Sequence, residues 1–533
     1  MALKIQRPTA SGLIRQFPTG GRSKRLAARI DAVLELFVPA AERHFAVRLW
    51  DGTTLPPVNG VADWTLVLKT PEVLRLALLH PDELALGEAF LRGDWDVDGD
   101  LEHVFELAEA IGHYRPHLRD LLRAAPLLVD GLRSRPHDRE AAAHRAREEG
   151  RAHTRGRDQQ MIRYHYDVSN AFYRLWLDRR MVYSCAYFAE SDYSLDQAQE
   201  AKLDLICRKL RLQPGERFLD IGCGWGALVM HAAKHYGVNA TGITLSESQA
   251  ALARERIAAA GLSDRCQVEI RDYRDLPTSW FDKAASIGMA EHVGTANLNG
   301  YFTAVRRALK PGGLFLNHAI TDVSGPGHRR GVMGDRGHES FIARHVFPDG
   351  ELQTIHDTLA AAEDMGFEVC DVESLRRHYA RTLRHWGERL EAHHDEALTM
   401  VDDVTYRVWR LYMAGAAYAF ARGNLSIMQT LFAKHHRQRR ALPADDAAGS
   451  PYAGHCHSPH GHTGVGNRHH ERSRFLSASG ARADGVSVGA SSFYGAAREG
   501  AKHSRLRYRP PLLVIFHIAP IAPGLDLDLQ WHR

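Results

Sequence analysis

Three glycines at alternate positions after a short apolar stretch limit what this chain can fold into. The segment Phe218–Ile221 predicts a buried strand, and Gly222, Gly224 and Gly226 follow it, immediately before an Ala/Leu/Val-rich helix. Glycine lets the backbone turn sharply and approach a ligand with no Cβ in the way, and the first N–H groups of the new helix are free to bind one. Such a turn is typical of a site for an adenosine-bearing cofactor, although a plain strand-to-helix turn is the alternative.

From this turn to about residue 320 the chain alternates between predicted strands and helices. Strands are expected from Pro214 to Ile221, Asn239 to Leu245, Gln267 to Arg271, Lys283 to Met289 and Leu314 to Ile320, with helices over 227–236 and up to about Gly261. The alternation predicts an α/β fold with a doubly wound, mostly parallel sheet. Ligands of such a sheet bind at the carboxyl ends of its strands.

Polar residues follow several of these strand ends. A dinucleotide site would show Gly-x-Gly-x-x-Gly and an acidic residue closing the second strand. Here the glycine spacing differs and the second strand ends at Thr244, so S-adenosylmethionine fits better. Thr244 and Gln249 are candidates for binding a ribose or a methionine tail, but Gln249 also completes a capping box with Ser246. Asp272 and Tyr273 close the third strand, where they could flank an adenine.

More specific motifs lie on both sides of the glycine turn. They are His165–Asn170, Tyr183-Ser184-Cys185-Ala186-Tyr187-Phe188, Gly288-Met289-Ala290-Glu291-His292-Val293-Gly294, Leu316-Asn317-His318-Ala319-Ile320 and Phe347-Pro348-Asp349-Gly350. In this order, from about Met161 to about Lys434, they resemble the cyclopropane-fatty-acyl-phospholipid synthase family, which is related to the mycolic acid cyclopropane synthases. The resemblance implies an S-adenosylmethionine-dependent methyltransferase with a class I Rossmann-like fold.

The reaction of that family accounts for the residue types. A methyl group is transferred to a cis double bond of an acyl chain, and a proton then leaves the added carbon as the ring closes. The carbocation-like centre needs a dry, apolar site. The resemblance implies bicarbonate as the base. It assigns bicarbonate binding to Cys185, Glu291, His318, the backbone amide of Ile320, and Tyr379.

Each catalytic candidate has an ordinary structural explanation. Cys185 could be a packing residue, because free cysteine is often buried. His318 could be a satisfied core histidine, and Tyr379 an aromatic residue of an amphipathic helix. Glu291 is harder to explain this way, because a carboxylate in an apolar segment needs partners.

For the cofactor, the resemblance implies eight residues. Tyr183 and Ser184 would lie near the methionine part, Gly222 and Gly224 at the turn, Thr244 and Gln249 on the ribose side, and Asp272 with Tyr273 near the adenine. Ala290 stands where the family often has an aromatic residue. This departure is expected to enlarge the wall beside Glu291 and to alter the acyl-chain preference.

At 533 residues the chain is long enough for two or more domains. We expect a small N-terminal α+β domain over 1–130, with strands near Val47–Gly52 and Trp64–Lys69. The resemblance implies that this domain engages lipid or forms a dimer. A charged linker over 131–160 and a catalytic domain over 161–435 follow, and a low-complexity, disordered tail is predicted over 436–533. The His455–His462 cluster in this tail could ligate a metal, but composition alone explains it better, so no metal site is predicted.

Composition narrows the location and the partners. Six scattered cysteines without a CxxC pair indicate a reducing compartment. No apolar run is long enough to predict a transmembrane helix. The net charge of +4 is compatible with visits to an anionic lipid surface and does not call for nucleic acid. We therefore expect a cytoplasmic protein, peripherally associated with the inner face of the membrane, that acts on unsaturated phospholipid acyl chains. A second copy of the chain, in a homodimer, is the other partner considered.

The primary prediction is thus a cyclopropane-fatty-acyl-phospholipid synthase that uses S-adenosylmethionine and bicarbonate. One alternative is a fatty-acyl methyltransferase that leaves a methyl- or methylene-branched chain. A second is a non-catalytic lipid-binding protein on the same scaffold. The intact set Cys185, Glu291, His318 and Tyr379 favours an enzyme, whereas the sequence does not distinguish ring closure from branching.

Overall fold

The computed structural model describes residues 21–57, 60–79, 83–113, 154–157, 169–323, 340–347 and 350–435. All of them belong to one compact unit, Met1–Asp446. The predicted tail over 436–533, the His455–His462 cluster and most of the predicted linker over 131–160 lie outside the described residues.

The N-terminal part of this unit is a small α+β lobe, as predicted. Its four-stranded sheet has the order β2-β1-β3-β4, in which β1 and β3 are parallel and the other pairs are antiparallel. The elements are α1 (Gly21–Leu34), η1 (Ala40–Glu42), β1 (Phe45–Arg48), β2 (Thr54–Leu55), β3 (Trp64–Leu68), α2 (Glu72–Leu79), α3 (Glu83–Leu91), β4 (Trp95–Asp98) and α4 (His103–His113).

The second lobe is built on a larger sheet with the order β11-β12-β9-β8-β5-β6-β7, with β10 paired to β9. The strands are β5 (Arg217–Ile221), β6 (Asn239–Thr244), β7 (Cys266–Ile270), β8 (Phe281–Ile287), β9 (Leu309–Asp322), β10 (Gln353–Thr354), β11 (Phe367–Ser374) and β12 (Leu425–Lys434). Strands β5 to β9 pair in parallel, whereas β12 is antiparallel to both of its neighbours. The predicted α/β class with a doubly wound, mostly parallel sheet is confirmed.

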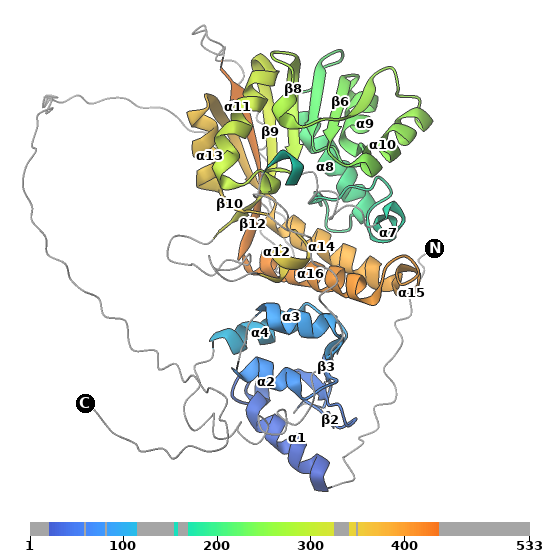
Figure 1. The fold of residues 1–533 in the computed structure, drawn as a ribbon, viewed down its shortest axis with the longest axis vertical. Coiled ribbons are helices and arrows are strands. Elements are labelled where there is room, and N and C mark those ends of the chain that lie inside the picture. The colour runs from blue at the N-terminus through green and yellow to red at the C-terminus, as the bar shows by residue number, and fades with distance from the viewer. Residues whose placement is uncertain are drawn as a thin grey trace, which may run out of the picture. The chain divides into compact units, whose positions relative to one another are not determined.

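Helices cover both faces of this sheet (Figure 1). The helices of the second lobe are α7 (Asn170–Trp176), α8 (Leu195–Lys209), α9 (Ala227–Tyr236), α10 (Glu247–Ala259), α11 (Leu298–Ala308), α12 (Phe341–His345), α13 (Ile355–Asp364), α14 (Arg376–Ala392), α15 (His394–Ala397) and α16 (Asp403–Arg422), with the short turns η3 (Tyr273–Asp275), η4 (Ala290–His292) and η5 (Thr295–Asn297). Of these, α8, α9 and α10 pack on one face of the sheet and α11 and α13 on the other. Within the described part of the chain, no helix is both long and apolar enough to cross a bilayer.

Alternate residues of the central strands supply two separate cores. Phe218 packs in a cluster with residues of α8, α9 and α10, whereas the next residue, Leu219, packs with α11 and α13. Leu316 and Phe315 of β9 divide between the same two clusters. Successive side chains of a strand point to opposite faces, so one apolar run can bury both faces of a sheet. The double covering holds the strand ends in fixed positions.

Strand β9 is longer than the predicted strand that ended at Ile320. It continues to Asp322 because β12 pairs along it, from Leu425 opposite Asp322 to Ala433 opposite Leu314. His318 therefore lies inside β9, with Gln429 of β12 directly opposite. The end that we predicted was too early because the partner strand lies about a hundred residues later in the chain.

Both Glu109 of α4 and Asp96 of β4 bind α16 from the N-terminal lobe, and Asp96 is the more buried of the two. Asp96 of β4 accepts hydrogen bonds from Arg407 at 2.9 Å and from Arg410 at 2.7 Å. The same two guanidinium groups donate to the carbonyl oxygens of Phe90 and Val97. Burial would raise the pKa of Asp96, but Arg407 and Arg410 hold that pKa below its usual value. The lobes thus meet at a largely buried ion cluster.

We expect Asp96→Ala to lower the free energy of unfolding by about 2 kcal/mol, because it removes the carboxylate that two partly buried guanidinium groups share. Each arginine keeps one carboxylate partner, Asp403 for Arg407 and Glu391 for Arg410. The matched change on the same strand, Asp98→Ala, removes an exposed ion pair with Arg48 and should cost about 1 kcal/mol or less. Thermal melting above and below pH 3.8 measures both effects. The pKa of Asp96 is lowered in the folded state, so the stabilisation is present above 3.8 and fades as the pH falls through the folded value. Equal losses in the two variants would contradict this account.

Candidate active site

Two adjoining cavities lie at the carboxyl ends of the parallel strands. The first has a volume of about 140 Å³ and the second about 80 Å³. They share the walls formed by Tyr183, Ser184, Ile287, Gly288 and His292. The first is lined by all eight residues predicted for the cofactor: Tyr183, Ser184, Gly222, Gly224, Thr244, Gln249, Asp272 and Tyr273. The second is lined by all five catalytic candidates: Cys185, Glu291, His318, Ile320 and Tyr379.

The glycine turn forms one wall of the first cavity. Gly222, Gly224 and Gly226 all have positive φ angles, of 80°, 51° and 82°, which side chains other than glycine rarely adopt. A Cβ on Gly222 would lie 3.1 Å from the side chain of Met289, whereas one on Gly224 would meet nothing within 4 Å. The backbone at Gly224 therefore faces open space at the cavity wall, as a ligand-binding turn requires.

Polar contacts from outside the sheet hold this turn in place. The indole N–H of Trp225 donates to the Asn170 side-chain oxygen at 2.7 Å. Arg256 of α10 donates to the carbonyl oxygens of Trp225 and Arg180, at 2.9 and 3.0 Å. Asn170 ends the predicted motif that begins at His165, and the residues before Ser169 lie outside the described part of the chain.

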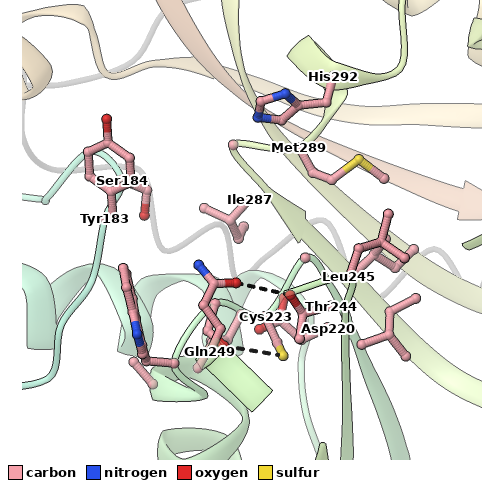
Figure 2. Close-up of a pocket in the computed structure, with 18 of the residues that line it drawn as sticks. Tyr183, Ser184, Asp220, Cys223, Thr244, Leu245, Gln249, Ile287, Met289 and His292 are labelled. Carbon is pink, nitrogen blue, oxygen red and sulfur yellow. Dashed lines mark hydrogen bonds between the residues drawn. The ribbon is translucent and has the colours of Figure 1, made fainter. Parts of the chain in front are cut away.

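Thr244 and Gln249 interact directly. The Thr244 hydroxyl donates to Oε1 of Gln249 at 2.9 Å, so Nε2 of Gln249 is available to an acceptor. Figure 2 shows this bond, with Tyr183 and Ser184 on one side of the cavity and His292 on the other. Ser246 does cap α10 by accepting from the Gln249 amide. The reciprocal bond of the alternative capping box is replaced by the contact with Thr244.

Asp272 lies at the cavity wall but already has a strong partner. Arg274 binds its carboxylate at 2.8 and 2.6 Å. Burial alone would raise the pKa of Asp272, yet the hydrogen bonds and charge of Arg274 hold it below the usual value. The Tyr273 ring contacts Tyr301 edge to face, with 5.4 Å between centroids. An adenine edge would meet a carboxylate that is ionised and fixed in position.

A buried lysine that the sequence analysis missed, Lys202, lines the first cavity. Nζ of Lys202 donates to the Ser184 hydroxyl at 2.9 Å. Burial lowers the pKa of Lys202 to about 8, against the opposite effect of Cys185, Asp178 and Asp220. Burial also raises the pKa of Asp220 to about 7, and one of its oxygens has no protein partner. The sequence signal that could have revealed this residue is the position of Lys202 on the apolar face of helix α8, among residues that are buried.

Cys185 is a neutral thiol in this setting. It is fully buried, and that burial raises its pKa well above the ordinary value. Its Sγ lies 3.2 Å from the carbonyl oxygen of Ala186. A nucleophilic cysteine needs the opposite shift. Cys185 can therefore line the site and offer a weak hydrogen bond, but a covalent role does not fit.

Glu291 is held by main chain rather than by a cation. One carboxyl oxygen accepts from the Ile320 amide at 2.7 Å, and the other is buried without a protein partner. Burial raises the pKa of Glu291 to about 7, with the Ile320 amide acting against it. The Ile320 amide, predicted as a bicarbonate ligand, is thus occupied by Glu291 in this structure.

His318 has one satisfied nitrogen and one free nitrogen. Nδ1 lies 3.3 Å from the side-chain nitrogen of Gln429, and Nε2 is buried without a protein partner. With Gln429 as donor, the neutral ring carries its proton on Nε2. Burial, together with the charges of Lys202 and Lys209, lowers the pKa of His318 well below its usual value. Gln429 of β12 therefore orients the ring.

Tyr379 joins an aromatic wall. Its ring lies 4.7 Å from Phe420 and 6.1 Å from Trp386, between ring centroids. Tyr412 of α16 also lines this cavity, and the sequence analysis missed it. Burial raises the pKa of Tyr412 to about 12, whereas hydrogen bonds with Tyr183 and Tyr379 act against the shift. Three tyrosine hydroxyls therefore interact at this wall.

Comparisons with known proteins agree with these motifs. The chain matches the family described as mycolic acid cyclopropane synthetase over residues 153–430. It is 43% identical over 391 residues to a protein of Pseudomonas putida named probable fatty acid methyltransferase, covering 73% of this chain and 91% of that protein. It is 33% identical over 380 residues to the cyclopropane-fatty-acyl-phospholipid synthase of Escherichia coli K12, covering 71% and 90%. The solved cyclopropane synthase MmaA2 of Mycobacterium tuberculosis covers 54% of this chain and 100% of its own, with 35% identity and a TM-score of 0.49.

The buried carboxyl of Glu291 gives a prediction about stability. The folded state raises its pKa from 4.5 to about 7, so stability that is present below 4.5 is lost as the pH rises toward 7. Glu291→Gln keeps the bond from Ile320 and does not ionise. Its free energy of unfolding relative to the wild type should therefore increase between pH 4 and pH 8, by on the order of 3 kcal/mol. Denaturant titrations at the two pH values measure the change, and a constant difference would show that Glu291 does not ionise against burial.

Proposed function

The chain belongs to the mycolic acid cyclopropane synthetase family, and on that premise we propose that it is an S-adenosylmethionine-dependent cyclopropane-fatty-acyl-phospholipid synthase. The observation that carries the proposal is the pair of adjoining cavities. One has the polar, glycine-walled character of a cofactor site, and the other is apolar apart from a few buried groups whose hydrogen-bonding atoms are free.

The residues of the first cavity fit S-adenosylmethionine. The open backbone at Gly224 accommodates a ligand beside the turn, and the free oxygen of Asp220 can accept from a hydroxyl or ammonium group. Nε2 of Gln249 is available to donate to the methionine or ribose part. Asp272 and Tyr273 would hold the adenosine. When bound, the cofactor supplies an electrophilic methyl group on a sulfonium.

The second cavity suits a positively charged reacting carbon. Its apolar walls exclude water, which would otherwise capture the cation. They consist of Ile287, Ile320, Ile342, Phe347, Leu352, Phe420, Leu425 and Ile427. The low pKa of His318 keeps the imidazole neutral, so the ring adds no positive charge beside the one that develops on the acyl chain.

The proton of the added carbon needs an acceptor in this cavity. Bicarbonate fits the groups present: Nε2–H of His318 and the hydroxyl of Tyr379 can donate to it. With a pKa of about 7, Glu291 is partly protonated near neutral pH, so its free oxygen can also donate rather than repel. Bicarbonate would supply the base, and Glu291, His318 and Tyr379 would position it. The turnover rate in carbon-dioxide-free buffer tests whether bicarbonate is the base. If the rate does not fall in that buffer, Glu291 itself accepts the proton.

A branched product is the second candidate, because one of the most similar relatives is named probable fatty acid methyltransferase. Mass spectrometry of lipids from cells with and without the gene, fed methyl-labelled methionine, separates the two. A product that gains one labelled CH₂ and resists ozonolysis contains a ring. A product that keeps an alkene is branched, and so is a saturated product that gains two further hydrogens from a reductant.

We infer further that the enzyme works from the cytoplasm on phospholipid chains at the inner face of the membrane, where the N-terminal lobe engages lipid. Flotation of the purified protein with anionic and zwitterionic vesicles tests the membrane step. Sedimentation of the same samples reports whether a homodimer forms.

Gly224→Val should abolish measurable binding of S-adenosylmethionine. The φ angle of 51° is strained for a β-branched residue, and the side chain would fill the space that the ligand needs. Gly261→Ala is the matched control, because Gly261 also has a positive φ and open space but lies outside both cavities. Calorimetry measures affinity and melting confirms folding. Unchanged affinity in a folded Gly224→Val protein would place the cofactor elsewhere.

Glu291→Gln and His318→Gln should each leave cofactor affinity near normal and lower single-turnover rates by on the order of 10²-fold or more. The double variant should lose much less than the product of the two losses, because groups that hold one base act as a unit. Added bicarbonate should raise wild-type turnover but restore neither variant fully. Full single-turnover activity in Glu291→Gln would rule out its role in proton removal.

A further inference from the structure

A third and larger cavity, of about 360 Å³, lies where the N-terminal lobe meets the second lobe. Helices α2, α3 and α4 line it on one side and α12 and α16 on the other. On α4 the lining residues recur at helical spacing, as Val104, Phe105, Ala108 and Ile111. One face of that helix is therefore directed at the cavity.

This cavity adjoins the catalytic one. Ile342, Tyr412 and Ala416 line both of them. The catalytic cavity in turn shares five lining residues with the cofactor cavity. The three spaces thus form a series that runs from the glycine turn, past Glu291 and His318, to the N-terminal lobe.

The chemistry of the walls indicates which part of a lipid this space can hold. None of the described residues that line it is Lys or Arg, and the charged one among them is the carboxylate Glu83. A phosphate or carboxylate head group would find no cation here and would be repelled by Glu83. Most of the lining is aliphatic or aromatic, which suits a hydrocarbon chain.

We propose that this cavity holds the methyl-terminal part of the substrate acyl chain, beyond the double bond, so that the N-terminal lobe determines which chain lengths are accepted. The double bond lies in the second cavity and the head group stays outside. The inference rests on the proposed function, because it takes the acyl chain as substrate.

Ala108→Phe fills the cavity from α4, and Ala110→Phe is the matched control, since Ala110 is on the same helix but does not line the cavity. Ala77→Phe fills it independently from α2. The substrates are phosphatidylglycerol vesicles with oleoyl or myristoleoyl chains, which differ only on the methyl side of the double bond. The ratio of kcat/KM for oleoyl over myristoleoyl chains should fall about tenfold in Ala108→Phe and Ala77→Phe and stay unchanged in Ala110→Phe. An unchanged ratio in folded cavity variants would overturn the proposal.

Two further measurements complete the test. Petroselinoyl and cis-vaccenoyl chains differ in the length of the segment on the carboxyl side of the double bond as well. If the cavity variants change selectivity according to the length of that segment, the cavity holds the carboxyl-side half of the chain and the proposal is wrong. Binding of the fluorescent fatty acid cis-parinaric acid, measured without cofactor, should weaken at least tenfold in Ala108→Phe and not in Ala110→Phe. If no lipid is turned over by the wild type, the proposed function fails, whereas this binding result still decides whether the cavity takes a hydrocarbon chain.

Discussion

The pairing of β12 along β9 is the contact on which the rest of the structure depends. It extends β9 past His318 and places Gln429 opposite that histidine. It also fixes the two helices that come before β12, because α14 packs against both α16 and β12. Those helices bring Tyr379 and Tyr412 to the second cavity, and α16 carries the arginines that bind the N-terminal lobe. Ten residues near the end of the described chain therefore organise both lobes.

Burial gives the site its electrostatic character. Burial removes water from the side chains of Asp220, Glu291, Lys202 and His318. In each case this destabilises the charged form of the group more than its neutral form. The pKa of each carboxyl rises to about 7, that of the lysine falls to about 8, and that of the histidine falls well below its usual value. Near neutral pH the histidine is therefore neutral, and the positive charge of Lys202 is balanced by carboxyls that are only partly ionised. Chemistry that passes through a cation in a dry cavity requires such a balance, because a strong fixed charge would either trap or repel it.

The sequence predicted the parts of the site that depend on local chain geometry. The glycine turn and six of the cofactor candidates (Gly222, Gly224, Thr244, Gln249, Asp272 and Tyr273) fall where alternating strands and helices place them, and helix α9 has the predicted bounds. The other two, Tyr183 and Ser184, came from the family resemblance. Contacts between distant segments were not predictable in this way. Gln429 reaches His318 only through strand pairing, Arg274 competes for Asp272, and Lys202 is buried only once α8 packs on the sheet. The roles of Cys185, Glu291 and Tyr379 came from the family resemblance, and the structure supplies their surroundings rather than their chemistry.

Helix α16 has a consequence that goes beyond its contacts. Arg407 and Arg410 bind Asp96 on one stretch of this helix, and Tyr412 and Ala416 line the cavities within the next two turns. Over so short a distance a helix moves as a rigid body. A movement of α16 that changes the docking of the N-terminal lobe therefore also changes the shape of the cavities. Under the proposed function, thermodynamic reciprocity then applies: whatever tightens the docking of the lobes changes the affinity for the acyl chain, and a bound chain changes the docking by the same factor. The two lobes therefore constitute a single equilibrium system.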